Sequence, residues 1–365
     1  MKVIIAGGGT GGHLFSGLAV YERLMKMGNM GKMEGNNSVF FIGTKDGIEA
    51  KVLPEMGLDV SFIPISKFRK SGIKAKISSL FLIPFSVVSA FRQVGKIKPD
   101  VTLGVGGYAS GPTVLASILR GIPTAVIEQN SVAGFTNRIL GRWVKRAFLG
   151  FPSAMSAFPQ DCGVFTGNPV KESLFDIPPI EEIEGPFCVL VFGGSQGARK
   201  INELIVDSLP KFGDFLEKLQ FIHITGPSDY SWVKAAYKKW KIKAVVYKFN
   251  SDMERLYAKA HWVISRSGAM TVSELAAAGK PSLLIPYPHA VDDHQAINAQ
   301  YLVDARAAVM FRQERLSGEK IAEMILYAMT ESEELSQMGQ RARSAARAEA
   351  VDEIVNYLSI LASKN

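Results

Sequence analysis

Cysteine is scarce in this chain of 365 residues, which contains only Cys162 and Cys188. Two cysteines cannot build a disulfide framework, and the absence of a CxxC pair excludes the usual zinc and redox centres, so we expect a reducing compartment. The N-terminus has no basic segment followed by a long apolar run, because Met1 and Lys2 lead directly into a short apolar stretch. We therefore expect no signal peptide and a cytoplasmic location.

Long apolar runs are also missing. The longest charge-free stretch of interest covers residues 77–91 and contains Pro84. A membrane-spanning helix needs about 20 apolar residues, so this segment is too short to cross a bilayer. The sequence predicts that it contacts a membrane without crossing it.

Acidic residues are absent between Asp59 and Asp100. Eight cations occupy this window: Lys67, Arg69, Lys70, Lys74, Lys76, Arg92, Lys96 and Lys98. They equal the whole net charge of +8, so the rest of the chain is neutral. A nucleic-acid binder would spread its charge more widely, and a local anionic partner is the better interpretation.

The centre of the same basic segment, residues 68–98, is apolar. Its large apolar side chains are Leu80, Phe81, Leu82, Ile83, Phe85, Val87, Val88 and Phe91. A buried helix hairpin would explain these residues but not the cations. A surface patch that rests on anionic lipid would explain both.

The composition, with 47% hydrophobic and 21% charged residues, is that of a globular protein, and the length predicts two domains. Short apolar runs at 2–6, 39–43, 100–106 and 123–129 alternate with amphipathic stretches, which is typical of a parallel sheet. The pattern restarts at 187–206 after a segment rich in proline and acid at 167–186. We predict an α/β protein with two doubly wound, Rossmann-like domains, 1–168 and 169–340, that face each other across a cleft, and a helical tail at 341–365.

Glycine-rich loops follow the first strand of each predicted domain. Gly7, Gly9 and Gly12 match the dinucleotide pattern GxGxxG, but no clear carboxylate closes the strand at 39–43. A second loop, GGSQGA at 193–198, has no use in a dehydrogenase. Such loops bind anions through backbone N–H groups at a helix start, although each glycine could instead serve only a tight turn.

The segment 265–302 is the most informative. A helix that begins near Ala269 could receive a diphosphate at its N-terminus, and Glu274 could accept hydrogen bonds from ribose hydroxyls. The alternative for Glu274 is a solvated helix charge. Gln295 and Asn298 are expected near one face of a following helix, where amides suit sugar hydroxyls.

Several motifs in order resemble the MurG family of peptidoglycan N-acetylglucosaminyltransferases. They are GGGTGGHLFSGLAV, GVGGYASGP, IEQNSVAGFTNR, GNPV, VFGGSQGA, RSGAMTVSELAAAGKP and DDHQAINA, and the resemblance runs from residue 1 to beyond 300. It implies a GT-B fold and inverting transfer of GlcNAc from UDP-GlcNAc to the C4 hydroxyl of MurNAc in lipid I, which forms lipid II. It also implies peripheral attachment to the cytoplasmic face of the cell membrane, with the first domain facing the lipid-linked acceptor and the second binding UDP-GlcNAc. It allows other cell-wall enzymes as partners and implies no cofactor and no nucleic acid.

The resemblance also implies roles for individual residues of this sequence. The residues that it places in substrate contact are Thr10, Gly11, Gly12, Asn130, Lys171, Ser195, Asn250, Ala269, Met270, Thr271, Val272, Ser273, Glu274 and Gln295. For Asn250 the implied contact is made by the backbone. Three positions depart from the family: Ser16, Ile127 and Lys171 stand where proline, histidine and often arginine are usual. Lysine at 171 cannot form the bidentate contact that arginine makes.

His13 directly follows the first glycine turn, and its ordinary pKa near 6.5 makes it a competent base. We interpret it as the group that deprotonates the acceptor hydroxyl, with acceptor positioning and a structural cap of the loop as alternatives. Glu128 is the rival base. No DxD motif occurs, so we expect metal-independent turnover in which amides, helix dipoles and Arg266 stabilise the leaving diphosphate.

Other functions share parts of this pattern. Within enzymes, these are a glycosyltransferase acting on diacylglycerol and a nucleotide-sugar epimerase. An NAD-binding oxidoreductase would rest on GxGxxG alone, and a membrane adaptor without catalysis would rest on the basic segment alone.

Overall fold

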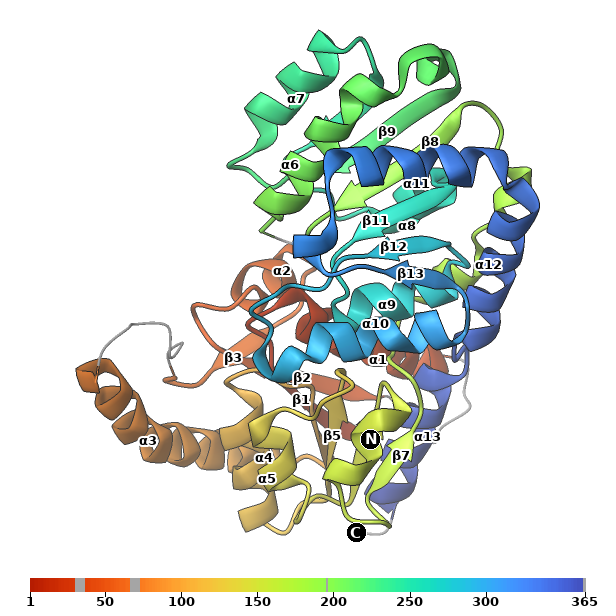
Figure 1. The fold of residues 1–365 in the computed structure, drawn as a ribbon. Coiled ribbons are helices and arrows are strands. Elements are labelled where there is room, and N and C mark those ends of the chain that lie inside the picture. Colours follow the sequence, from red (N-terminus) through yellow and green to blue (C-terminus); the bar gives the residue numbers. More distant parts are fainter. Residues whose placement is uncertain (30–36, 66–72, 195, 364–365) are drawn as a thin grey trace. The chain divides into compact units, whose positions relative to one another are not determined.

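The computed structural model describes residues 1–29, 37–65, 73–194 and 196–363. The chain divides into two compact units, residues 1–170 with 349–365, and residues 171–348 (Figure 1). Each unit is an α/β domain of the Rossmann-like kind, as the sequence predicts. The predicted tail is divided between them, because 341–348 belongs to the second unit and 349–365 to the first.

The first unit contains a parallel sheet of seven described strands in the order β3-β2-β1-β4-β5-β6-β7. The strands are β1 (Lys2–Ala6), β2 (Ser38–Gly43), β3 (Val60–Phe62), β4 (Val101–Gly104), β5 (Thr124–Glu128), β6 (Arg146–Leu149) and β7 (Gly163–Phe165). The helices are α1 (Gly11–Asn29), α2 (Glu49–Glu55), α3 (Ile73–Ile97), α4 (Ser110–Leu119), α5 (Phe135–Leu140) and α13 (Ala350–Ser363).

Both faces of this sheet are covered, which is why β1 reads as a continuous apolar run. Val3 and Ile5 pack into a core with Leu14 and Leu18 of α1, and with Ile354 of α13. On the other face Ile4 and Ala6 pack with α3 and α4, through Ala90, Val94 and Ala116. The C-terminal helix α13 therefore completes the first unit by packing on α1 and β4 (Figure 1).

The second unit contains a parallel sheet of six described strands in the order β10-β9-β8-β11-β12-β13. The strands are β8 (Phe187–Phe192), β9 (Leu219–Ile224), β10 (Lys243–Tyr247), β11 (Trp262–Ser265), β12 (Ser282–Leu284) and β13 (Ala308–Met310). The helices are α6 (Arg199–Ser208), α7 (Tyr230–Lys239), α8 (Met253–Lys259), α9 (Ala269–Ala277), α10 (His294–Asp304), α11 (Gly318–Thr330) and α12 (Ser332–Ala345).

The strand orders determine where ligands can bind. In each sheet the order reverses beside the first strand, between β1 and β4 and between β8 and β11. Loops after neighbouring strands leave in opposite directions at such a point, and they open a crevice at the carboxyl ends of the strands. Both glycine loops lie at these positions, since one follows β1 and the other follows β8.

Helix α3 runs continuously through Pro84 as a single helix rather than a hairpin. No helix within the described residues combines the length and apolar character needed to cross a membrane. Of the sequence predictions, Lys67, Arg69, Lys70 and Ser195 lie outside the described residues. The same holds for the side chains of Lys74, Lys76 and Leu80 to Ile83.

Candidate active-site residues in the two units

The first glycine loop leaves β1 through three residues with positive φ, Gly7 at 143°, Gly8 at 136° and Gly9 at 83°. Close contacts forbid side chains here. A Cβ on Gly7 would lie 2.2 Å from the Gly106 carbonyl oxygen, and one on Gly8 would lie 2.3 Å from the Glu49 carboxylate. The loop is therefore pressed between the segment that follows β4 and the start of α2.

His13 lies in the first turn of α1. Its Nδ1 is 3.2 Å from the Gly8 carbonyl oxygen and 3.0 Å from the Thr10 hydroxyl oxygen. A carbonyl oxygen only accepts hydrogen bonds, so Nδ1 carries the hydrogen in the neutral ring and Nε2 keeps its lone pair. Desolvation lowers the pKa of His13, while the bond to Gly8 and the charges of Glu128 and Glu49 oppose that shift. The Nε2 lone pair is thus left available as a proton acceptor.

Glu128 ends β5 and is buried. Its Oε1 accepts from the Asn130 N–H at 3.1 Å. Its Oε2 accepts from the Gly134 N–H and from Asn137 Nδ2, both at 2.9 Å. These bonds shape the loop that carries Asn130, and they occupy both oxygens that a rival base would need. A base role for Glu128 stays a prediction, and the geometry favours loop organisation.

The second glycine loop, like the first, combines positive φ angles with close backbone contacts. Gly194 and Gly197 have φ of 91° and 76°. The Gly197 N–H donates to the Gly194 carbonyl at 3.0 Å, and a Cβ on Gly197 would lie 2.2 Å from the Thr225 carbonyl oxygen. The loop therefore rests directly on the segment that follows β9.

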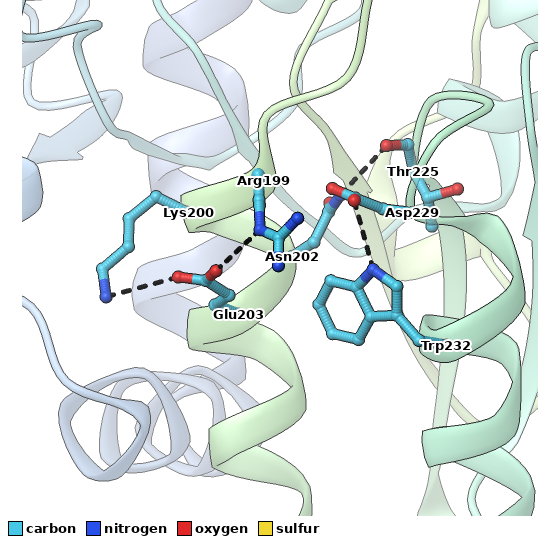
Figure 2. A network of polar contacts seen from close by, with 7 residues as sticks. All are labelled: Arg199, Lys200, Asn202, Glu203, Thr225, Asp229 and Trp232. Carbon is cyan, nitrogen blue, oxygen red and sulfur yellow. Dashed lines mark hydrogen bonds and ion pairs between the residues drawn. The ribbon is translucent and has the colours of Figure 1, made fainter.

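A buried polar network holds that segment, as Figure 2 shows in part. Asn202 Nδ2 donates to the Thr225 carbonyl at 2.9 Å and to Asp229 Oδ2 at 2.8 Å, while Asp229 Oδ1 accepts from Trp232 Nε1 at 3.1 Å. Asn202 comes from α6, so the network ties this helix to the chain on which the glycine loop rests. At the exposed start of α6, Arg199 and Lys200 pair with Glu203 (Figure 2).

His223 completes this network. Its Nε2 lies 3.0 Å from Asn202 Oδ1, and its Nδ1 lies 3.0 Å from the Tyr237 hydroxyl. Because the Asn202 amide nitrogen already donates twice, its oxygen must accept, and Nε2 of His223 carries the hydrogen. Burial lowers the pKa of His223 to about 3. The ring is therefore a neutral structural element and has no spare proton to exchange.

The start of α9 is the third candidate element. Gly268 caps the helix in an extended conformation, and residues 269–274 fill its first turns. Asn298 of α10 donates to the Ser267 carbonyl at 3.2 Å and so fixes the entry to the helix. The N–H groups of a first helical turn point along the axis and favour an anion.

Glu274 lies in this helix beside a cluster of polar groups. Its Oε2 accepts from the Tyr257 hydroxyl at 3.0 Å. Desolvation raises the pKa of Glu274 to about 7, against the lowering effects of the Tyr257 bond and of the Lys171 charge. A carboxylate in this state can still receive further hydroxyl donors.

Lys171 binds a protein carboxylate. Its Nζ lies 2.7 Å from Glu254 Oε1, and Ser173 donates to Glu254 Oε2 at 2.6 Å. Desolvation would raise the pKa of Glu254, but the bonds from Lys171 and Ser173 outweigh it and keep that pKa below its ordinary value. The predicted substrate contact of Lys171 therefore competes with this ion pair.

Arg266 and Gln295 both hold the loop after β12. Arg266 Nη1 donates to the carbonyls of Ile285 at 3.1 Å and Pro286 at 2.9 Å, and Nη2 donates to Gln313 Oε1 at 2.6 Å. Gln295 Oε1 accepts from the Tyr287 N–H at 2.9 Å. These bonds orient the Gln295 amide, and they give the Arg266 guanidinium a structural task beside its predicted contact with the diphosphate.

Asn250 precedes α8, and its Oδ1 accepts from the Asp252 N–H at 2.8 Å. The side chain is thus used locally, which leaves the backbone contact as the expected one. Among the described residues, no group of three or more His, Cys, Asp or Glu side chains could hold a metal ion.

Two family descriptions match consecutive parts of the chain. Glycosyltransferase family 28 N-terminal domain matches residues 3–149, and Glycosyltransferase family 28 C-terminal domain matches residues 188–354. The chain belongs to glycosyltransferase family 28.

Relatives of this family 28 chain are similar over nearly their whole length. The UDP-N-acetylglucosamine–N-acetylmuramyl-(pentapeptide) pyrophosphoryl-undecaprenol N-acetylglucosamine transferase of Myxococcus xanthus is 43% identical, over 98% of this chain and 92% of the relative. The crystal structure of Acinetobacter baumannii MurG is 32% identical with a TM-score of 0.77, over 98% of this chain and 99% of that one. A UDP-GlcNAc 2-epimerase from Neisseria meningitidis, at 15% identity and a TM-score of 0.67 over the whole of both chains, shares the fold.

Sequence reasoning missed several residues of the family 28 chain that support these loops: Glu49, Asn202, His223 and Tyr257. A signal existed for Glu49, which closely follows β2, where the ends of parallel strands meet. The carboxylate sought at the end of this strand for a dinucleotide ribose is instead bonded to the glycine loop itself, through Gly9 N at 2.6 Å. Glu49 is thus engaged by the protein itself, and both halves of the chain match glycosyltransferase family 28 rather than a dehydrogenase.

Proposed function

We propose that this chain transfers GlcNAc from UDP-GlcNAc to MurNAc of a polyprenyl-pyrophosphate-linked MurNAc-peptide, and so converts lipid I to lipid II for peptidoglycan synthesis. The observation that carries the proposal is the relative from Myxococcus xanthus, whose name states this reaction and which is 43% identical over 98% of the chain. The arrangement of glycine loops and helix starts in both units supports it.

The donor binds to the second unit in this proposal. The N-terminus of α9 receives the diphosphate, Glu274 accepts from the ribose hydroxyls, and the oriented amide of Gln295 contacts the sugar. The backbone at Asn250 contacts the uracil. Met270, Thr271, Val272 and Ser273 line the same helix start, and Ser195 and Lys171 are further contacts.

The first unit supplies the base. His13 Nε2 takes the proton from the C4 hydroxyl of MurNAc, whose oxygen attacks the anomeric carbon of GlcNAc as the bond to UDP breaks. Attack opposite the leaving group inverts the configuration. The electron pair of the broken bond leaves on UDP, where backbone amides and the helix dipole stabilise the charge. Thr10, Gly11, Gly12 and Asn130 contact the substrates around this point.

The lipid-linked acceptor stays in the membrane, so the enzyme needs a surface that binds the membrane. The first unit has a surface suited to this. Phe85, Val88 and Phe91 of α3 are exposed at intervals of three residues, so they share one helical face. Arg92, Lys96 and Lys98 are exposed in the same region. This pattern fits the predicted patch better than a buried hairpin does.

A second exposed surface lies on and after α5, which packs on α4, as α3 does. Phe135, Ile139 and Trp143 are exposed, and they line a shallow pocket with Arg138 and Arg142. Apolar side chains beside cations suit the headgroup region of an anionic bilayer. We assign the exposed parts of α3 and α5 to peripheral attachment on the cytoplasmic face of the cell membrane.

Ligand-induced thermal shift tests the donor class. UDP or UDP-GlcNAc should raise the melting temperature through mass action, and NAD should not. Stabilisation by NAD without stabilisation by UDP would contradict the proposal. Turnover in excess EDTA should persist, and a strict requirement for Mg²⁺ with fully dispersed acceptor would contradict the metal-independent chemistry.

A further inference from the structure

Glu49 is a buried carboxylate behind the first glycine loop. It is the first residue of α2, and only 1% of its surface is exposed. Its Oε1 accepts from the Thr44 N–H at 2.8 Å and from the Thr44 hydroxyl at 2.9 Å, and its Oε2 accepts from the Gly9 N–H at 2.6 Å. No ion pair to Glu49 occurs in the described part of the chain. Within the described residues, the groups that stabilise its charge are these polar hydrogens and the N-terminus of α2.

One peptide group connects Glu49 to His13. The N–H of Gly9 and the carbonyl of Gly8 belong to the same amide plane. Its N–H donates to Glu49 Oε2 at 2.6 Å, and its oxygen lies 3.2 Å from His13 Nδ1. The Gly8 N–H is also bound, to the Gly106 carbonyl at 3.2 Å. The Gly8–Gly9 peptide is thus hydrogen-bonded through both its N–H and its oxygen, and the peptide before it is bonded through the Gly8 N–H.

The packing around this peptide leaves no room for side chains on the neighbouring glycines. A Cβ on Gly107 would lie 2.0 Å from the Gly8 oxygen, and one on Gly8 would lie 2.3 Å from the Glu49 carboxylate. A Cβ on Gly106 would lie 2.7 Å from the His13 ring. Glycine at these positions lets Glu49, the peptide and the ring approach one another.

We propose that Glu49 is a positioning residue that acts through the Gly8–Gly9 peptide to align His13 and to stabilise its protonated form during proton transfer. A negative charge at the N–H end of an amide polarises it and makes its carbonyl a stronger acceptor. The carbonyl then holds the Nδ1 hydrogen and directs Nε2 to the substrate. In Ser-His-Asp enzymes a carboxylate does this by direct contact, whereas here an amide group intervenes.

The charges of Glu128 and Glu49 raise the pKa of His13, whereas desolvation lowers it. Glu128 is unsuited to the test because its removal would release the loop with Asn130. Glu49 also packs against Gly43 and Gly47, so a purely structural role is the competing explanation. The two explanations differ in whether the titration of His13 responds to the carboxylate charge.

The test compares Glu49→Gln, which keeps the shape, removes the charge and replaces one acceptor oxygen by an amide nitrogen, with Thr44→Val, which removes one donor and keeps the carboxylate. The pKa and tautomer of His13 are read by NMR of the ring nitrogens, assigned with His13→Gln. In the parent protein the neutral ring should carry its hydrogen on Nδ1. Glu49→Gln should lower the pKa of His13 by about half a unit or more, and Thr44→Val should change it by less.

Kinetics give the second readout, and this arm rests on the proposed function. The acid limb of kcat/KM should move to lower pH in Glu49→Gln, by the same shift that NMR shows. The kcat on the plateau should fall about tenfold, with KM for UDP-GlcNAc unchanged. A structural role alone would lower thermal stability in both variants and leave the acid limb in place.

The results separate the two proposals. An unchanged pKa of His13 in folded Glu49→Gln, or a neutral ring with its hydrogen on Nε2, overturns the positioning role of Glu49 even if transfer is active. A shifted pKa of His13 in Glu49→Gln, together with a parent protein that transfers no GlcNAc, supports the positioning role of Glu49 and overturns the proposed function.

Discussion

Tyr257 and Glu274 are joined by a hydrogen bond of 3.0 Å from the phenol oxygen to Oε2. Desolvation nevertheless raises the pKa of Glu274 to about 7. The carboxyl proposed to bind the ribose is therefore only partly ionised near neutral pH. A proton on Glu274 therefore favours the folded state, whereas its loss favours binding of the donor.

Glu274→Gln should stabilise the protein above pH 7. The folded pKa of about 7 lies above the ordinary value of 4.5. The stabilising proton is therefore fully present below 4.5 and is lost as pH rises through 7. Without a carboxylate the variant avoids that loss, so it should gain roughly 1–3 kcal/mol at pH 8 and little at pH 4.5. Urea unfolding at both pH values measures this, with exposed Glu217→Gln as control, and an equal gain at both would contradict it.

UDP affinity should rise with pH through about 7 in the parent protein. Ribose hydroxyls donate more strongly to the ionised carboxylate, so bound UDP lowers the pKa of Glu274 and releases a proton. Calorimetry in buffers of different ionisation enthalpy counts that proton. Glu274→Gln should lose both the proton release and about tenfold in affinity, while Tyr257→Phe should keep the release. Unchanged UDP affinity in Glu274→Gln would remove Glu274 from the site.

His13→Gln should lower kcat by about 100-fold or more and leave donor affinity largely intact, because the lost group acts on the acceptor hydroxyl. Initial rates over a range of both substrates, with UDP binding measured separately, give the comparison. A change confined to KM would instead assign His13 to acceptor positioning, which is the alternative that the sequence left open.

His223 should remain neutral down to about pH 3. Its folded pKa of about 3 lies below the ordinary 6.5, so the unfolded chain takes up the proton first. Stability of the second unit should therefore fall as pH drops from 6.5 toward 3. Ring NMR and hydrogen exchange of α6 and β9 follow the two effects, and a His223 midpoint near 6 would contradict the buried network.

Arg138→Gln combined with Arg142→Gln should weaken binding to anionic liposomes roughly tenfold or more, because each cation near a membrane contributes about 1 kcal/mol. The binding should also fall with salt. Sedimentation with Lys238→Gln and Lys239→Gln in α7 provides a matched control from the second unit. Equal binding of the parent protein to neutral liposomes, or of the arginine variant to anionic ones, would exclude this surface.

The apolar periodicity predicted the two parallel sheets well, because strands buried on both faces leave a strong signal, as β1 does. The glycine loops were equally visible, since they combine positive φ with close backbone contact. The assignment of residues 349–365 to the first unit could not be predicted, because the pattern of an amphipathic helix does not indicate which core the helix packs against. Glu49 was missed for a related reason, since its place shortly after β2 was a signal but its partners Gly9 and Thr44 are brought together only by the fold. Bonds of Arg266 to main-chain carbonyls leave no sequence pattern at all.

The central claim is tested most directly by incubating the protein with labelled UDP-GlcNAc and a short-chain polyprenyl-pyrophosphate MurNAc-pentapeptide. We predict a product that gains one GlcNAc, joined with inverted configuration to the C4 oxygen of MurNAc, together with one UDP per transfer. Transfer to diacylglycerol instead, epimerisation of the donor, or release of UDP without incorporation into the lipid-linked acceptor would contradict it.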